Sequence, residues 1–580
     1  MEVGGDDILE TKPTSEEVRF GHYYDYEELT RVLKNLVSNY PAASRLRSIG
    51  KTPEGRDLWL VEITNFREGA AESKPAIWMD GNTHAGEVMG SMICLRTIHY
   101  LLKSLSSEPY VTKLLNDVVF YVVPRVDPDG AEFFLKTHYY ALPGDNETGG
   151  GRWYPLSKEE WTRTQSGLYM EDVNGDGSIA SMRIEDPNGD WRVSSKDPRI
   201  MVRRGPSEVN GPFYRIYPEG FLLNHEGGRE IRMAAARWSM NLNRNYPDDW
   251  SKQEIDRGSG PYPLSEPETR AIVDFIVDHP NICLAITYHT HGGVALGYSE
   301  EAKLPKEDQR LFGILESIFV KETSYVADAR SPKPKGNFAN YLTLHRGIPC
   351  LIIEVWDMAG LAGIGSFVER GGFGFSYASM TEDQTLKVLE WSDRELKGKG
   401  FVPWTEFDHP QLGRVEIGGW KARFLWRNPP EEFIEREADR NALFPIRCAW
   451  LLPRVRIVNW ETKKRGENIY EIKATVANLG ALPTYVSKHA VNIGGVKPVE
   501  VRLELSEGAK LLGSQDISRI QLDGYLIRDI AEPKSERVVC GDKHRETLVW
   551  HVEAKGAHKV TIRVNSQRAG KDEVTFSIPH

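Results

Sequence analysis

The sequence predicts an α/β domain with a mixed, mostly parallel sheet and helices on both faces, followed by an all-β sandwich domain. In the first 400 residues, buried apolar runs alternate with segments of helical spacing, which is typical of a largely parallel sheet. From about residue 452 the pattern changes to short alternating segments between turn residues, which is typical of an antiparallel sandwich. A chain of 580 residues is also too long for a single hydrophobic core.

We expect the chain to have three parts. Residues 20–400 would form the α/β domain, residues 401–451 a connecting segment rich in Pro, Trp and Gly, and residues 452–580 the sandwich. Within the first part, the alternation stops between about residues 135 and 235, where Gly, Asp, Asn and aromatic residues are frequent. Irregular connections of this length are usually functional, so we predict a large insertion at the edge of the crevice.

The predicted elements follow one another in the order that this fold requires. Helical spacing begins over residues 26–40 and ends at Pro41, because proline cannot continue a helix. Apolar runs predict strands at residues 58–63, 76–79, 118–123, 282–288 and 350–353. Amphipathic spacing predicts helices at residues 88–102, 266–279, 309–325 and 381–396. In the sandwich, alternation predicts strands at residues 455–458, 470–476, 499–505, 545–552 and 558–564.

The composition excludes several classes of partner. A net charge of −10 and the lack of a basic block argue against nucleic acid or an anionic membrane surface. No apolar run approaches the roughly 18 residues of a membrane span. The acidic N-terminus lacks a signal-peptide pattern, which fits a cytoplasmic protein or an exported one whose signal has been removed. The oligomeric state is left open.

Polar side chains follow three of the predicted strands at their carboxyl ends. His84 and Glu87 lie three positions apart in a turn after the first of these strands. His289 and Glu354 each directly follow a later strand. Two histidines and a carboxylate are a common catalytic zinc set that leaves one position for water. A further carboxylate, that of Glu354, is then suited to act as a general base.

The five cysteines do not offer an alternative metal site. They are scattered and odd in number, and most lie in apolar runs, so we interpret them as small core residues. Any metal site in this chain is therefore a His/Glu site.

From about residue 23 to residue 396 the chain resembles the zinc metallocarboxypeptidases, the carboxypeptidase A-like peptidases. The matching features are the His84-x-x-Glu87 turn, the Asn-Arg-Asn turn at 243–245, the segment at 49–56, His289 and Glu354. The resemblance implies that His84, Glu87 and His289 hold Zn²⁺. It also implies that Glu354 activates a water molecule and passes the proton to the leaving amine.

The same resemblance implies a substrate anchor. Arg244, with Asn243, would bind the free C-terminal carboxylate of a peptide, because a guanidinium presents a rigid fork that matches a carboxylate. The alternative for Arg244 is a structural salt bridge.

The chain departs from the family pattern at several positions. Gly86 stands where many relatives have an arginine between the ligands. Asn241 stands where the family usually has an aspartate that orients the first zinc histidine, and an amide can still accept from an imidazole N–H. The family also has an arginine that stabilises the oxyanion and precedes the Asn-Arg pair in the sequence. Our candidate for this arginine is Arg183, with Arg203 and Arg237 as alternatives.

The expected position of the substrate-capping tyrosine is also altered. This tyrosine should lie upstream of Asn340, but residues 331–337 contain none, so we predict Tyr341 as its substitute. The specificity position falls near Ala339 or Asn340, which suggests neither a strictly basic nor a clearly bulky apolar preference.

A second possible ion site lies in the insertion. Asp172, Asn174, Asp176 and Ser178 place oxygens at alternate positions, as in the first half of a Ca²⁺ loop. The bidentate glutamate expected at the twelfth position is absent, because Arg183 stands there. A calcium loop and an ion-free acidic turn both fit this stretch.

Three hypotheses about function follow. The first is a zinc-dependent carboxypeptidase with one catalytic Zn²⁺ and a peptide or protein substrate that has a free C-terminus. The second is a cell-wall peptide amidase or amidohydrolase on the same zinc core, which an amidated substrate would distinguish. The third belongs to another class: a non-catalytic, calcium-dependent binding or adhesion protein that uses the sandwich as its interaction module.

Overall fold

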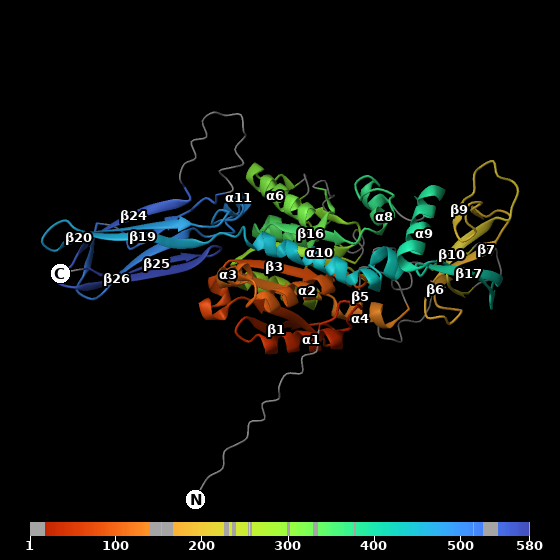
Figure 1. The fold of residues 1–580 in the computed structure, drawn as a ribbon, viewed down its shortest axis with the longest axis horizontal. Coiled ribbons are helices and arrows are strands. Elements are labelled where there is room, and N and C mark those ends of the chain that lie inside the picture. The colour runs from red at the N-terminus through yellow and green to blue at the C-terminus, as the bar shows by residue number, and fades with distance from the viewer. Residues whose placement is uncertain are drawn as a thin grey trace, which may run out of the picture.

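A computed structural model of the protein describes residues 18–138, 152–153, 166–224, 231–234, 239–252, 255, 258–298, 302–328, 335–375, 379–513, 515–525 and 543–578. Three units follow one another along its longest axis: the sandwich, the α/β domain in the middle, and a smaller β unit at the other end (Figure 1). Among the described residues, no helix is both long and apolar enough to cross a membrane.

An eight-stranded sheet forms the centre of the α/β domain. Its strands are β1 (Ser44–Lys51), β2 (Asp57–Ile63), β3 (Ala76–Gly81), β4 (Val119–Val123), β13 (Ile282–Thr290), β14 (Val294–Leu296), β15 (Val326–Ala327) and β16 (Cys350–Val355). They lie in the order β1-β2-β4-β3-β13-β16-β14-β15. The pairs β4–β3, β3–β13 and β13–β16 in the middle are parallel, whereas β1–β2, β2–β4 and β14–β16 are antiparallel. The predicted fold class is therefore confirmed.

Helices pack on both faces of this sheet. The longer helices of the described chain are α1 (Tyr26–Asn39), α2 (Met89–Ser104), α3 (Pro109–Asp117), α4 (Pro128–Lys136), α5 (Pro267–Asp278), α6 (Lys306–Thr323), α9 (Glu382–Leu396) and α10 (Glu431–Ala449). Successive side chains of a strand point to opposite faces. Ile77 and Met79 of β3 accordingly pack in one apolar cluster with α2, α6 and α10, while Trp78 packs in another with α5. Burial on both faces explains why these strands are apolar throughout.

The predicted connecting segment at residues 401–451 is not a linker. It contains β17 (Phe401–His409), β18 (Gly413–Trp420) and α10, and Ile434 and Phe444 of α10 are fully buried in the α/β core. Pro445 lies inside α10, and a proline within an apolar-periodic stretch predicts the end of a helix. The structure nevertheless continues α10 through Pro445 to Ala449.

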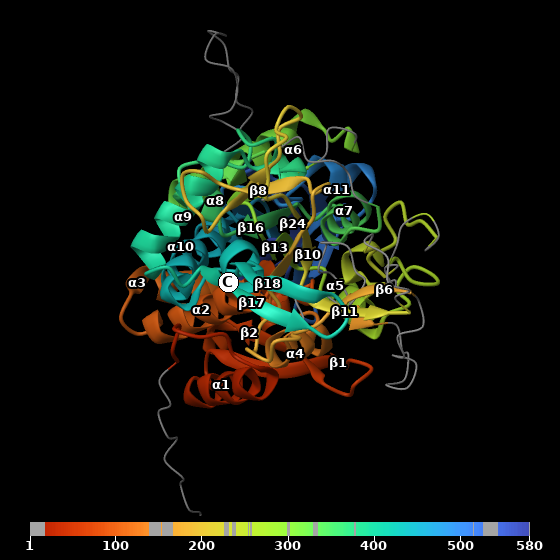
Figure 2. The same cartoon turned by 90° about the vertical axis from the view of Figure 1, so that its right-hand side faces the viewer.

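The insertion predicted at about residues 135–235 contains strands of a second sheet. Its order is β17-β18-β7-β10-β8-β9, where the strands from the insertion are β7 (Ser181–Glu185), β8 (Trp191–Val193), β9 (Met201–Arg203) and β10 (Tyr214–Pro218). Two smaller sheets pair β6 (Gly167–Met170) with β11 (Gly220–Leu223) and β5 (Arg152–Trp153) with β12 (Ser239–Met240). In the end-on view, β17 and β18 lie in front of the central sheet (Figure 2).

The C-terminal domain is an antiparallel β-sandwich, as predicted. Its strands are β19 (Val455–Lys464), β20 (Ile469–Asn478), β21 (Val499–Leu505), β22 (Lys510–Leu512), β23 (Ile517–Ile520), β24 (Arg545–Glu553), β25 (His558–Ser566) and β26 (Gly570–Ile578). They form two four-stranded sheets, β19-β20-β24-β22 and β23-β21-β25-β26. A shared apolar core lies between the sheets, and Trp550 is its largest fully buried side chain.

Arg568 joins the sandwich to the α/β domain. Its guanidinium is buried and donates to the carbonyl oxygens of Gly347 (2.8 Å) and Arg346 (2.9 Å), which precede β16, and to that of Tyr485 (3.3 Å). Burial lowers the pKa of Arg568 to about 10. The bond to Gly347 is fully buried and the other two are partly buried, so the guanidinium satisfies acceptors that water reaches poorly.

We expect Arg568→Ala to lower the free energy of unfolding by about 2–5 kcal/mol, since each buried carbonyl left without a donor costs about 1–3 kcal/mol. Urea unfolding of the full chain measures the change. Arg563→Ala is the matched control, because Arg563 forms exposed ion pairs with Glu504 and Glu573 on the sandwich and should have little effect. Equal stability of the two variants would contradict the role given to Arg568.

Candidate metal centre

Two parallel strand pairings bring the carboxyl ends of three strands together. β13 pairs with β3 so that Tyr288 lies opposite Gly81, and it pairs with β16 so that His289 lies opposite Glu354. The turn that follows β3 therefore begins beside His289 and Glu354. Ligands bind at this edge of open α/β sheets because the connecting turns form a crevice there.

Local contacts fix the turn after β3. Asn82 has a positive φ of 59°, and its side-chain N–H group donates to the carbonyl oxygens of His84 (2.6 Å) and Ala85 (3.2 Å). A Cβ atom on Gly81 would lie 2.5 Å from the backbone of Gly90, so this position must be glycine for β3 to pass so close to α2. The turn thus holds its side chains in a fixed position relative to the sheet.

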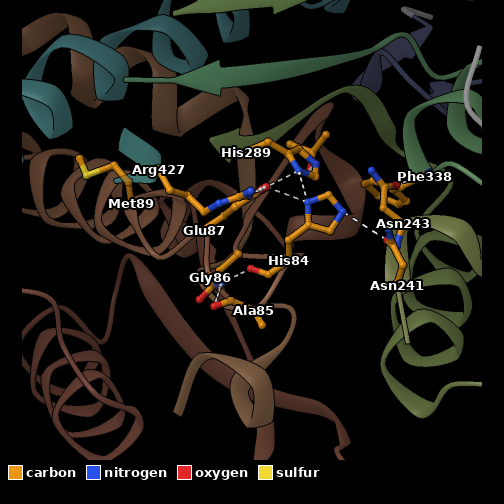
Figure 3. A network of polar contacts seen from close by, with 12 residues as sticks. His84, Ala85, Gly86, Glu87, Met89, Asn241, Asn243, His289, Phe338 and Arg427 are labelled. Atoms are coloured by element: carbon orange, nitrogen blue, oxygen red, sulfur yellow. Dashed lines mark hydrogen bonds and ion pairs between the residues drawn. The ribbon is translucent and has the colours of Figure 1, made fainter. Parts of the chain in front are cut away.

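His84, Glu87 and His289 converge on one point (Figure 3). Nδ1 of His84 lies 3.0 Å from one oxygen of Glu87 and 3.2 Å from Nδ1 of His289. Nδ1 of His289 lies 3.0 Å from the other oxygen of Glu87. Ligand atoms of the three residues all lie within 4.8 Å of one another. Two imidazole nitrogens and a carboxylate fit Zn²⁺.

Asn241 selects the tautomer of His84. Its side-chain oxygen accepts the backbone N–H of Asn243 at 2.9 Å, which identifies the atom as oxygen and not nitrogen. Nε2 of His84 lies 3.2 Å from the same oxygen and must therefore carry a proton. Nδ1 is then left as the lone-pair donor that faces Glu87 and His289. The amide thus performs the orienting role that the resemblance assigns to an aspartate.

A second network of hydrogen bonds supports His289. Thr287 donates its hydroxyl proton to Asp80 at 2.6 Å, and its oxygen lies 3.4 Å from Nε2 of His289, from which it can accept. Burial raises the pKa of Asp80 to about 6, while hydrogen bonds from Thr287 and Trp78 favour its charged form. Both histidines therefore present Nδ1 to the common point and have an acceptor near Nε2.

The carboxylate of Glu354 lies at the same edge without being part of this group. It is buried, and its Oε2 atom has no hydrogen-bond partner among the described residues. Burial and the charge of Glu87 raise the pKa of Glu354 to about 8, whereas the charges of His289 and Arg427 act in the opposite direction. A raised pKa in a buried site is what a group that accepts and returns a proton near neutral pH requires.

The described residues contain one other group with metal-ligand composition, formed by Glu62, Glu72 and His279. Arg47 forms an ion pair with Glu62, and its Nη2 lies 3.4 Å from Nε2 of His279. The guanidinium of Arg47 already supplies positive charge to the cluster of Glu62, Glu72 and His279. The group of His84, Glu87 and His289 is therefore the better metal site.

Asn243 and Arg244 follow closely on Asn241, the residue that contacts His84. The side-chain oxygen of Asn243 accepts the backbone N–H of Phe338 at 2.9 Å, and Nη1 of Arg244 donates to the Asn243 carbonyl at 2.8 Å. Burial is the main cause of the lowered pKa of His84, and the charge of Arg244 adds to it. Their role in binding a substrate stays a prediction.

The structure does not bring Arg183 to the metal-binding group. Its Nε and Nη2 each donate to the carboxylate of Glu416 at 2.8 Å, and the guanidinium lies 4.5 Å from the ring centre of Trp404 within the six-stranded sheet. Arg203 lies in the same sheet and pairs with Asp190, and Arg237 is outside the described residues. We therefore correct the prediction for Arg183: it forms a structural ion pair between β7 and β18.

Tyr341 is part of the hydrophobic core instead of a substrate cap. It is buried and packs against Tyr246 with a ring-centre distance of 6.2 Å. The backbone N–H of the neighbouring Asn340 donates to the side chain of Asn337 at 3.1 Å. The prediction that Tyr341 caps a substrate is not supported, and the role of Asn340 in specificity stays a prediction.

The possible calcium loop is shaped by its own hydrogen bonds. The carboxylate of Asp172 accepts three backbone N–H groups, those of residues 175–177, at 2.8–3.1 Å. Asp176 accepts the backbone N–H and hydroxyl of Ser178 at 2.9 Å, and Asn174 donates to Asp176 at 3.1 Å. Because these oxygens already bind donors of the loop, its shape needs no ion, and the calcium prediction is not supported.

Two residues that contact the metal-binding turn are not recognisable from the sequence. Arg427 donates from Nη1 to the carboxylate of Glu87 at 3.2 Å (Figure 3). The side chain of Asn428 donates to the carbonyl oxygen of Gly86 at 2.7 Å. Both lie about 340 positions from the turn, between β18 and α10. No local pattern in the sequence could have identified them.

We expect Asn241→Ala to weaken zinc binding about 10–100-fold, because His84 loses the acceptor that fixes its tautomer. Asn241→Asp should bind zinc more tightly than the wild type, since a charged acceptor raises the basicity of the ligand. Competition with a chelator measures both dissociation constants. Asn459→Ala, at an exposed position of the sandwich, is the control. Unchanged affinity in Asn241→Ala would contradict this assignment.

Comparisons with known proteins agree with this site. A family model described as zinc carboxypeptidase matches residues 29–167 and 170–347, and a model of a domain of unknown function matches residues 454–577. Human carboxypeptidase D is 32% identical over 194 residues, which cover 30% of this chain and 14% of that protein. Mouse carboxypeptidase M is 26% identical over 176 residues, which cover 27% of this chain and 40% of that protein.

Among solved structures, carboxypeptidase A from Helicoverpa armigera is similar at 17% identity and a TM-score of 0.37, over 66% of this chain and 76% of its own. The aligned regions span well under half the length of the two curated relatives. The family model, in contrast, matches more than half of this chain and includes the turn with His84 and Glu87 as well as His289. The chain therefore belongs to the zinc carboxypeptidase family.

Proposed function

We propose that the protein is a zinc-dependent metallocarboxypeptidase that removes residues from the C-terminus of peptides. The observation that supports this most strongly is the convergence of His84, Glu87 and His289 at the carboxyl edge of the sheet, where Glu354 lies opposite His289. Glu354 is buried, and its Oε2 atom has no hydrogen-bond partner in the described part of the chain. Membership of the zinc carboxypeptidase family agrees with it. A protein that only binds a partner would not need a buried general base beside its metal-binding residues.

His84, Glu87 and His289 would hold the zinc ion through two Nδ1 atoms and a carboxylate. When bound, zinc supplies a Lewis acid that polarises a carbonyl group and increases the acidity of water. Asn241 and Thr287 keep both imidazoles in the tautomer that ligation requires. The carboxylate oxygens of Glu87 lie 3.0 Å from Nδ1 of each histidine and would complete the ligand set.

Glu354 would act as the general base and acid. Its carboxylate accepts a proton from the attacking water, and the resulting carboxylic acid returns the proton to the nitrogen of the leaving amine as the peptide bond breaks. The buried position of Glu354, opposite His289 in the sheet, suits both halves of this exchange. Burial keeps bulk water from competing for the proton.

Arg244 and Asn243 would set the position of cleavage. The carboxylate at the end of a peptide would bind the guanidinium of Arg244, which lies close enough to His84 to affect its pKa. An anchor at a fixed distance from the metal limits hydrolysis to the last peptide bond, since only a terminal carboxylate can occupy it.

Two peptides of the same sequence, one with a free C-terminus and one with an amidated C-terminus, test this function. We expect the zinc-loaded protein to cleave the free acid with a kcat/KM about 10–100-fold higher, because hydrogen bonds to a charged group contribute about 1.5–3 kcal/mol. Arg244→Ala should remove this difference by lowering kcat/KM for the free acid alone. Liquid chromatography of the released residue measures both substrates.

Equal cleavage of the two peptides by the wild type, with no effect of Arg244→Ala, would contradict the carboxypeptidase proposal and favour an amidase on the same zinc core. No cleavage of either peptide by protein with stoichiometric zinc would contradict both.

A further inference from the structure

The cluster of Glu62, Glu72 and His279 lies at the edge of the central sheet opposite to the first metal-binding group. Glu72 belongs to the short helix η2 (Ala71–Ser73), which precedes β3, and His279 follows α5 and precedes β13. The cluster therefore lies at the amino ends of the strands whose carboxyl ends carry the first group. At about 3.3 Å per residue, the length of β13 separates the two groups by about 25 Å.

His279 presents the tautomer that a metal ligand requires. Its Nδ1 lies 2.7 Å from the carbonyl oxygen of Phe275, which can only accept, so Nδ1 carries the proton. In the neutral ring, Nε2 then holds the lone pair. Burial lowers the pKa of His279, which favours this neutral form. A histidine that donates its other ring N–H to a backbone carbonyl is the arrangement commonly found for metal ligands.

The negative charge of Glu62 is only partly balanced by its neighbours. Glu62 is 2% exposed, and its burial, together with the charge of Glu72, raises its pKa. The charges of Arg47 and Arg45 act in the opposite direction but do not outweigh burial. A further positive charge in the cluster would therefore stabilise the ionised carboxylate.

A buried oxygen atom without a partner accompanies the cluster. The side-chain nitrogen of Asn281 donates to the carbonyl oxygens of Ala71 (3.1 Å) and Lys74 (2.8 Å). These two residues lie on either side of Glu72, and Asn281 is two positions after His279. Its side-chain oxygen is buried and has no hydrogen-bond partner among the described residues. A water molecule held by an ion in the cluster would supply the missing donor.

Arg47 competes with an ion for the same ligands. It forms an ion pair with Glu62, and its Nη2 lies 3.4 Å from Nε2 of His279. Its side chain is 42% exposed, so the guanidinium can leave for water without opening the core. A divalent ion brings twice the charge and binds the imidazole lone pair directly, whereas the guanidinium reaches it only by a long contact.

We propose that Glu62, Glu72 and His279 form a second binding site for a divalent transition-metal ion such as Zn²⁺, which displaces the guanidinium of Arg47. One imidazole and two carboxylates suit Zn²⁺ better than Mg²⁺, which prefers oxygen ligands alone. The ion connects β2, η2 and the end of α5, and it stabilises this edge of the sheet. It lies too far from the first group to take part in a reaction there, so this inference does not depend on the proposed function.

The test titrates full-length protein that already holds one equivalent of Zn²⁺ with further Zn²⁺, and metal analysis after equilibrium dialysis measures the bound ions. We expect the wild type to bind a second equivalent, and Glu72→Gln and His279→Ala to lose it while they keep the first. Arg47→Ala should bind the second ion at least about 10-fold more tightly, because a competing positive charge is gone. Glu68→Gln, at an exposed position of η1 (Phe66–Glu68) in the same connection, is the matched control.

Thermal unfolding provides a second readout. An ion that binds only the folded protein stabilises it more as the free ion concentration rises. Once the first site is filled, further Zn²⁺ should therefore raise the melting temperature of the wild type and of Glu68→Gln but leave that of Glu72→Gln unchanged. Mg²⁺ at the same concentration should have no effect on the wild type.

A wild type that binds only one equivalent at every zinc concentration at which it stays folded would overturn the second site. So would a second equivalent that Glu72→Gln and His279→Ala both retain, since the ion would then lie elsewhere. Equal or weaker binding by Arg47→Ala would contradict the competition. If His279→Ala does not fold, Glu72→Gln decides, because Glu72 is exposed. Failure to cleave peptides would contradict the proposed function and leave this site untouched.

Discussion

The metal centre depends on the parallel register between β13 and its two neighbours. β3 ends beside Tyr288 and β16 carries Glu354 opposite His289, so the turn ligands, the second histidine and the base meet at one edge. A shift of one residue in β13 would turn His289 to the opposite face of the sheet. The buried, apolar sequence of these strands holds the register, because any shift would also remove large side chains such as Tyr288 from the core.

The sequence predicted the fold class and the metal-binding group for a physical reason. Strands buried on both faces are continuously apolar, and their ends are marked by the polar residues that follow, so His84, His289 and Glu354 stand out from their surroundings. The β-sandwich is equally visible because one face of its strands is exposed and their side chains alternate. The local periodicity of the sequence was therefore sufficient to predict both the α/β domain and the β-sandwich.

The errors arose where function and packing depend on contacts between distant segments. Arg183 was chosen for its place before the Asn-Arg pair, but Glu416 pairs with it from more than 200 positions away. Arg427 lies in a stretch without regular spacing, and only the folded chain shows that it contacts Glu87. Tyr341 was chosen from its place in the chain, whereas its packing against Tyr246 is a tertiary feature. No single-sequence pattern contains these pairings.

The central claim is that Glu354 serves as the base beside zinc ligands to which it does not itself belong. Turnover of a C-terminally free peptide by zinc-loaded Glu354→Gln protein tests this most directly. An amide of nearly the same shape leaves the ligands in place but cannot accept the proton, so we expect stoichiometric zinc and a kcat about 10²–10⁴-fold below that of the wild type. Full activity in this variant, or loss of its zinc, would contradict the account.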